Sequence, residues 1–145
     1  MNRYISKAKT LDGEWVQGYY VKEFKKYMIV NYEKIMTPFG EERSMTYKQI
    51  DSNTLCMCTG KEGANKDLIF EGDYFWLEDA EGEIGVIYWD NDRCAWWVRS
   101  VPNTVENECV PDFSTTIENY ELGEFLDSEI HIIGNVHDRK VVRYE

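Results

Sequence analysis

The chain has 145 residues, of which 43% are hydrophobic and 30% charged, a composition typical of a folded globular protein and not of a disordered one. Its 16 basic and 27 acidic side chains give a net charge of −11, which opposes binding to nucleic acid, because that polyanion is bound mainly by Lys and Arg. No apolar run approaches the ~18 residues of a membrane span and no apolar segment follows Met1, so we expect no membrane segment, no signal peptide and a cytoplasmic location.

The charge is unevenly distributed along the chain. Residues 1–50 contain 9 basic and 6 acidic side chains, whereas residues 51–145 contain 7 and 21. The two parts would attract one another, within one chain or between copies. A solubilising acidic surface is the simpler alternative. We expect an N-terminal hairpin and loop-rich extension over residues 1–53 and a β-rich domain over residues 54–145.

Strand signals dominate the first part of the chain. Two runs of β-branched and aromatic residues, 15–21 and 27–32, predict a β-hairpin joined by the charged segment between them. Residues 33–51 contain Thr37-Pro38-Phe39-Gly40 and mixed charges, which favour a loop-rich segment with room for one helical turn. A short strand is expected over residues 54–58, ending at Thr59-Gly60.

The middle of the chain gives the clearest pattern. Aromatic and β-branched runs at 74–78, 84–89 and 94–99 are separated by acidic turns, with centres about ten residues apart. This spacing predicts an antiparallel meander in a small sandwich or barrel. Glu71-Gly72-Asp73 precedes the first run as a structural turn, because glycine adopts positive φ and aspartate can bond its own turn. Such a turn before a bent sheet is typical of SH3-like barrels.

The last part of the chain is more polar. Residues 100–119 predict an extended loop. The final strand is expected over residues 130–133, stopped by Gly134-Asn135 as a second structural turn, and residues 138–145 are expected to form a polar tail or an edge pairing. One short helix is predicted over residues 117–126 from Ile117, Leu122, Phe125 and Leu126, of which the last three lie on one face at helical spacing. The elements together predict a mainly β (α+β) protein: an SH3-like β roll or small barrel with an N-terminal β-hairpin extension and one or two short helices.

Three stretches of the sequence resemble, in order and spacing, the YopX-like family of small phage and prophage proteins. The family pattern is T-G, a short polar turn, I-x-E-G-D, a G-V-V strand and a closing V-I-G-N-I. The corresponding stretches are Thr59-Gly60 with LIFEGD at 68–73, GVIYWD at 85–90 and IHIIGNV at 130–136.

The resemblance covers about residues 58–136 and departs from the family pattern in two places. Asn65-Lys66-Asp67 stands where the family usually has Asn-Gly, so a tight primed turn is not assured there. His137-Asp138-Arg139 stands where the family often has Glu-Asn-Pro. The resemblance implies a phage or prophage origin, the cytoplasm of a bacterial host, an SH3-like β roll and no assigned activity, and it supplies no catalytic residues to carry over.

The candidate metal ligands are cysteine and acidic residues. Cys56 and Cys58 would share one strand face and could bind a metal with Cys94 or His131. This pattern is weak, and the acidic turns at 78–83 and 90–92 do not complete a calcium-binding loop. We expect reduced thiols at all four cysteines, Cys109 included, with no metal and no cofactor.

Cysteine, histidine and acidic residues are also the candidate catalytic groups. A cysteine nucleophile with His131 and a pair of carboxylates are the enzymatic alternatives, but no flanking motif supports either one. Neither a P-loop nor a dinucleotide-binding motif occurs. We therefore expect a protein that is not an enzyme.

Aromatic residues give the best indication of function. In each of the three meander strands both alternating faces are apolar, unlike an antiparallel sheet with one wet face. The second face must be covered by the N-terminal hairpin or the predicted 117–126 helix, or else by a partner or another copy. The expected interaction residues are Trp76, Trp89, Trp96 and Trp97. The sequence thus predicts a self-associating interaction module that binds host or phage proteins; the alternative is an acidic decoy that occupies a nucleic-acid-binding site on a host protein.

Overall fold

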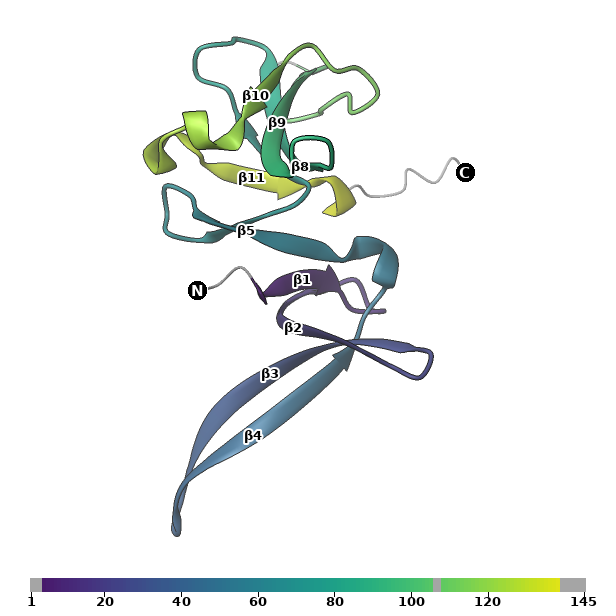
Figure 1. Ribbon diagram of the computed structural model, residues 1–145, viewed down its shortest axis with the longest axis vertical. Coiled ribbons are helices and arrows are strands. Elements are labelled where there is room, and N and C mark those ends of the chain that lie inside the picture. The colour runs from purple at the N-terminus through teal and green to yellow at the C-terminus, as the bar shows by residue number, and fades with distance from the viewer. Residues whose placement is uncertain (1–3, 106–107, 139–145) are drawn as a thin grey trace. The chain divides into compact units, whose positions relative to one another are not determined.

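The computed structural model describes residues 4–105 and 108–138, and the chain divides into two compact units, Met1–Cys58 and Thr59–Glu145 (Figure 1). The sequence placed the division between residues 53 and 54, ahead of strand β5 (Cys56–Glu62), whereas the structural division falls inside this strand. Among the described residues, no helix has the length and hydrophobicity needed to cross a membrane.

The first unit is an antiparallel meander. Its strands lie in the order β4-β3-β2-β1, and the beginning of β5 pairs with β1. A small core of Ala8, Ile29 and Ile50 holds them together. The 3₁₀ helix η2 (Ser52–Thr54) leads into β5, and its first turn is capped by Asp51, whose Oδ1 accepts a hydrogen bond from Asn53 N at 3.0 Å. The strands are β1 (Ser6–Lys9), β2 (Trp15–Glu23), β3 (Lys26–Thr37) and β4 (Gly40–Gln49).

The prediction of a loop-rich segment at 33–51 is wrong. Strand β3 continues to Thr37, Pro38 and Phe39 form a two-residue turn, and β4 returns from Gly40, which has a φ of 117° that favours glycine. The residues read as a break in the pattern are therefore the tip of a long hairpin. Alternation of apolar and polar residues was missing from the sequence because both faces of this hairpin are largely exposed.

The second unit contains the predicted meander. Its larger sheet is antiparallel with the order β10-β9-β8-β7-β11, and the end of β5 neighbours β6, where Thr59 Oγ1 donates to Ile69 O at 2.9 Å. The mainly β class is confirmed, and across the described residues neither sheet closes into a barrel. The strands are β6 (Leu68–Phe70), β7 (Asp73–Trp76), β8 (Glu83–Asp90), β9 (Ala95–Pro102), β10 (Asn119–Glu121) and β11 (Ile132–Asn135).

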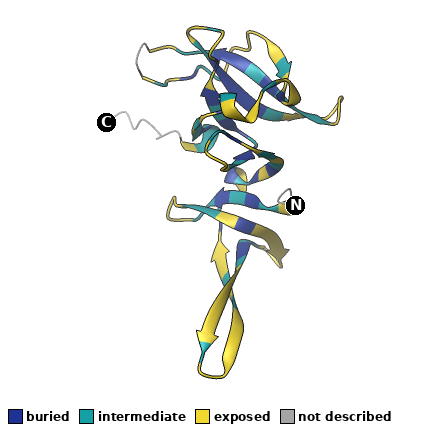
Figure 2. Ribbon diagram, turned by 90° about the vertical axis from the view of Figure 1, so that its left-hand side faces the viewer, coloured by how far each residue is buried: buried dark blue, intermediate teal, exposed yellow. Residues whose placement is uncertain are grey.

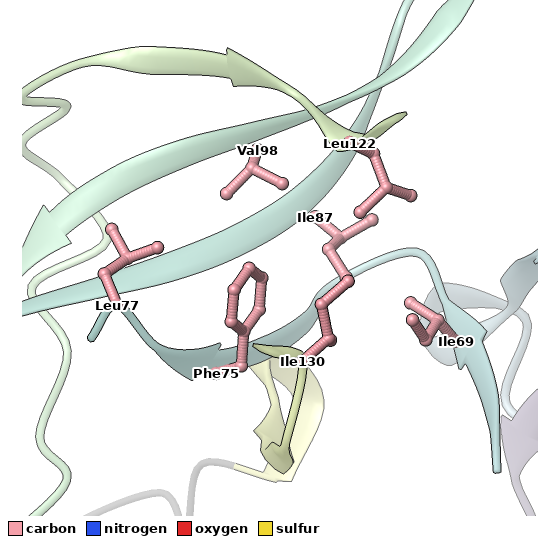
Figure 3. Packing of buried hydrophobic residues seen from close by; sticks show 7 residues of the cluster. All are labelled: Ile69, Phe75, Leu77, Ile87, Val98, Leu122 and Ile130. Carbon is pink, nitrogen blue, oxygen red and sulfur yellow. The ribbon is translucent and has the colours of Figure 1, made fainter. Parts of the chain in front are cut away.

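Both faces of this larger sheet are apolar, as predicted, and both are covered by other parts of the same unit. One face carries Phe75, Ile87 and Val98, which pack under Leu122 and Ile130 (Figure 3). The opposite face is covered by the loop between β9 and β10. On this face, the buried sheet residues Ile84, Val86 and Val101 pack against Tyr74, Cys109, Phe113 and Val136.

The predicted 117–126 helix does not form. Residues in this region form two single 3₁₀ turns, η3 (Leu122–Glu124) and η4 (Asp127–Glu129), because Phe125 and Leu126 between them have extended backbone angles. Leu122 and Phe125 pack on the sheet, whereas Leu126 is 67% exposed. Helical spacing of three apolar residues was therefore coincidental.

Two strand boundaries also differ from the sequence prediction. Strand β5 runs through Thr59-Gly60 to Glu62, with Gly60 at a φ of 83°. The final strand β11 contains Gly134 and Asn135 instead of stopping before them, and it is followed by the 3₁₀ helix η5 (Val136–Asp138). Most of the predicted polar tail, residues 139–145, lies outside the described residues.

Candidate interaction surfaces

The four predicted tryptophans do not form one surface. Trp89 pairs across the strands with Trp96, at 5.2 Å between ring centroids, on the sheet face that carries Phe75. Trp76 pairs with Ile84, and Trp97 pairs with Tyr88, on the opposite face. Trp76 and Trp89 are 39% and 40% exposed, and Trp96 and Trp97 are half-buried. Strand alternation thus divides the set into two pairs.

The acidic turn beside these tryptophans has a structural role. Asp90 Oδ1 accepts hydrogen bonds from Asp92 N at 2.9 Å and Arg93 N at 3.2 Å, and Asp90 Oδ2 pairs with Arg93 Nη1 at 2.9 Å. Loss of hydration alone would raise the pKa of Asp90, but these hydrogen bonds outweigh it and lower the pKa. Arg93 also lies over the Trp97 ring, 4.0 Å from its centroid. Asp90 therefore holds the turn between β8 and β9 closed.

The two predicted structural turns meet in one buried hydrogen-bond network. Asp73 is 1% exposed, and its Oδ2 accepts from Phe70 N at 2.8 Å while its Oδ1 accepts from Asn135 Nδ2 at 2.9 Å. The Asn135 amide also donates to Glu71 O at 3.1 Å. Gly72, at a φ of 82°, lies between them. Its N–H donates to Ile87 O, and its carbonyl accepts from Val136 N.

Space for these contacts depends on glycine. A Cβ at Gly72 would lie 2.9 Å from Val136 Cγ2, and one at Gly134 would overlap the Tyr74 ring, which pairs with it across the strands. The residues that carry the family resemblance thus join β7 to β11 as structural parts. Asp73 and Asn135 are both buried.

A cleft of about 270 Å³ opens between β7 and the segment 120–129. Its apolar walls are Phe75, Leu77 and Phe125, and carboxylates stand at its rim. The rim residues are Glu78, Asp79, Glu124 and Glu129. This arrangement suits an apolar group that carries a positive charge. No local sequence pattern indicates the cleft, because its two walls are more than forty residues apart in the chain.

Tyr120 borders this cleft, and its hydroxyl donates a short hydrogen bond to Glu118 Oε2. This bond, with desolvation and nearby carboxylates, raises the pKa of Tyr120 from 10.0 to about 12. The phenol form is favoured by folding, so this contribution to stability is present below pH 10 and is lost as the pH rises through about 12.

In the variant Glu118→Gln we expect the pKa of Tyr120 to fall toward 10, measured from the ¹³Cζ chemical shift of the assigned tyrosine by NMR. Glu124→Gln is the matched control, because it removes a more distant carboxylate and keeps the hydrogen bond. An equal fall in both variants would show that general charge, and not the bond to Glu118, controls Tyr120.

A surface that sequence reasoning missed lies on the first unit. We define the hairpin ribbon as residues 31–46, where β3 pairs with β4 alone, since β2 pairs with β3 only as far as Val30. Figure 2 shows these strands as mostly exposed. The ribbon nevertheless carries large apolar side chains, and these are at least 45% exposed: Tyr32, Ile35, Met36, Phe39 and Met45. The occurrence of these apolar residues in a charged stretch was the only indication of this surface in the sequence.

One face of this ribbon combines aromatic and basic side chains. Tyr32, Lys34 and Arg43 of the ribbon line a shallow groove of about 450 Å³, together with Glu33 and with Tyr19 of β2. Lys34 and Arg43 are directly opposite one another across the strands, a pairing of like charges that is unfavourable. Lys34 is partly compensated by Glu41 at 3.7 Å. The arrangement is unusual for a surface that serves only solubility.

Strand β4 is an edge of its sheet. Two observations show which residues of β4 form backbone hydrogen bonds with β3. Thr37 and Gly40 close the two-residue turn, and Ile50 N donates to Tyr27 O at 2.9 Å. Even-numbered residues of β4 bond inward, so the backbone N–H and C=O groups of the odd-numbered residues point outward. These outward residues are Glu41, Arg43, Met45, Tyr47 and Gln49.

The four cysteines lie in three separate segments of the chain. Cys56 and Cys58 are buried on one face of β5, Cys109 is half-buried, and Cys94 is exposed in the β8–β9 turn. Burial raises the pKa of the Cys109 thiol. Within residues 4–105 and 108–138, no three His, Cys, Asp or Glu side chains converge in a geometry that could hold a metal ion.

Comparison of this chain with protein-family models, with curated proteins and with solved structures finds no match. The similarity to the YopX-like family therefore stays a prediction.

Proposed function

We propose that this chain is a non-enzymatic protein-interaction module, encoded by a phage or prophage, that associates with copies of itself through the hairpin ribbon. The observation that carries the proposal is a two-stranded ribbon with large exposed apolar side chains, which are Tyr32, Met36 and Met45 on one face, Ile35 on the other and Phe39 in the turn. A two-stranded hairpin alone is marginally stable in water, and exposed apolar patches of this kind mark interaction surfaces. A partner on the ribbon would supply the burial that the monomer lacks.

The meander tryptophans support this proposal less than the sequence suggested. Other parts of the second unit cover most of both faces of the larger sheet and leave Trp76 and Trp89 only partly exposed, at 39% and 40%. The ribbon now supplies the exposed apolar surface in their place.

Light scattering after size exclusion tests the proposal. At tens of micromolar we expect the wild-type protein to have at least twice the monomer mass of 17.1 kDa. The variant Tyr47→Asp, at the residue of β4 directly after the ribbon, should return to the monomer mass without unfolding, because a carboxylate is solvated on the exposed monomer surface and desolvated in a contact. A wild-type mass of 17.1 kDa would refute self-association.

Trp89→Asp is the matched control for this experiment. Trp89 is 40% exposed and Tyr47 is 53% exposed, so both variants place a charge on an aromatic site at the surface. The ribbon proposal expects Trp89→Asp to keep the wild-type mass. Dissociation by Trp89→Asp and not by Tyr47→Asp would place the contact on the meander and contradict the role of the ribbon.

A further inference from the structure

Resting on this proposed function, we infer that the partner of β4 is the β4 strand of a second copy, paired antiparallel about a two-fold axis at Met45. The two ribbons then become one continuous sheet of four strands at the contact. Each copy contributes the same edge, so the interface is isologous and closes as a dimer.

The hydrogen-bonding pattern of the edge permits this pairing. An antiparallel ladder requires outward-pointing groups on both strands to lie directly opposite one another. With Met45 on the axis, Met45 pairs with its own copy, Arg43 with Tyr47, and Glu41 with Gln49, and all of these have outward-pointing backbone groups. The outward N–H and C=O groups over residues 41–49 would thereby gain partners, as exposed strand edges tend to do.

The side chains are self-complementary in this register. Glu42 lies opposite Lys48 of the second copy, and the symmetry produces this ionic pair twice. Arg43 meets the exposed ring of Tyr47 of the second copy, and this contact compensates the unfavourable pairing of Arg43 with Lys34 of β3. Ser44 lies opposite Thr46, and the two Met45 side chains pack together at the axis. Every charged residue of β4 beyond Glu41 therefore has a favourable opposite residue.

Neighbouring registers lack this complementarity. Sliding one strand by two residues places either Glu42 opposite Thr46 or Lys48 opposite Ser44, so both ionic pairs are lost. Sliding by one residue places outward-pointing backbone groups of one strand opposite inward-pointing groups of the other, so the hydrogen bonds cannot form. It also moves the side chains of one strand to the opposite face of the sheet. Among these registers, the sequence of β4 favours the one centred on Met45.

Charge reversal at Glu42 and Lys48 tests this register. Glu42→Lys places lysine opposite lysine twice, and Lys48→Glu places glutamate opposite glutamate twice, so each variant alone should raise the dimer dissociation constant at least about tenfold. An equimolar mixture of the two variants restores both ionic pairs. We expect monomer mass for each variant, and dimer mass for the mixture and for the double variant, by light scattering at low salt.

Glu33→Lys is the matched control, because it makes the same charge change on β3, away from the proposed edge. It should keep the wild-type dissociation constant. A wild-type protein that associates while both single reversals remain associated would overturn the β4 register and leave the proposed function standing. A wild-type protein that is monomeric would overturn the proposed function itself. Circular dichroism of each variant separates dissociation from unfolding.

Cross-linking gives an independent measurement of the same axis. Met45→Cys places two thiols directly opposite one another, within the Cα separation that a disulfide requires. Mild oxidation should produce a covalent dimer in this variant. Glu41→Cys adds the same thiol eight residues away from its own copy along the ladder, so it should cross-link no more than the wild-type protein. Equal cross-linking of the two variants would contradict the register.

Discussion

Replacement of Asp73 by alanine is expected to lower the free energy of unfolding by about 4 kcal/mol. The Asp73 carboxylate is buried and accepts hydrogen bonds from Phe70 N and Asn135 Nδ2, so the truncation removes the acceptor of two buried donors. A buried donor that loses its partner costs about 1–3 kcal/mol, and bonds to charged groups are at the upper end. Urea denaturation followed by tryptophan fluorescence measures the change.

Asp79→Ala is the matched control for this experiment. Asp79 is exposed in the turn after β7, and its truncation should change stability by no more than about 0.5 kcal/mol. Asp73→Asn should fall between the two, because it keeps an amide oxygen as acceptor and places an amide group against a donor. Similar urea midpoints for Asp73→Ala and Asp79→Ala would show that the hydrogen-bond network around Asp73 does not stabilise the fold.

Phe75→Ala is the second substitution with a large expected effect, a loss of about 3–5 kcal/mol. Phe75 is 1% exposed, stacks edge-on against Phe125 at 5.4 Å between centroids, and lies over Gly85, its cross-strand partner. A Cβ at Gly85 would come within 3.0 Å of the Phe75 ring, so the glycine provides the space that the ring fills. Its removal leaves a cavity that rigid sheet backbone cannot close.

Trp76→Ala is the control here, because Trp76 is adjacent in the sequence but points to the opposite face and is 39% exposed. Its truncation should destabilise the protein by less than half as much, as thermal and urea unfolding would both report. If the larger residue Trp76 proved the more important of the two, the assignment of the buried core to the Phe75 face would be wrong.

The meander could be predicted because its signal is local. Runs of β-branched and aromatic residues separated by short acidic turns specify β7, β8 and β9 whatever the rest of the chain does. Adjacent residues in a strand must point to opposite faces, so the separation of Trp96 from Trp97 also follows from the sequence. The helix predicted from Leu122, Phe125 and Leu126 does not form. Three residues at helical spacing are a weak signal, and the packing of Leu122 and Phe125 on the sheet outweighs it.

The hairpin ribbon shows the opposite situation. Burial on one face produces the alternation that identifies a strand, and residues 31–46 lack such a face, so their sequence has no period of two. Only the register between β3 and β4 shows that this segment is a strand pair, with β4 at an edge.

The amino-acid sequence alone determined the β class, the meander and the uneven charge, since each depends on composition or on neighbouring residues. The tertiary structure alone decided which distant groups meet. Asp73 and Asn135 are 62 residues apart and share a hydrogen bond, and the loop around Phe113 covers a sheet face that the sequence left open. Such contacts depend on how the chain closes in three dimensions, and no local pattern of residues encodes that closure.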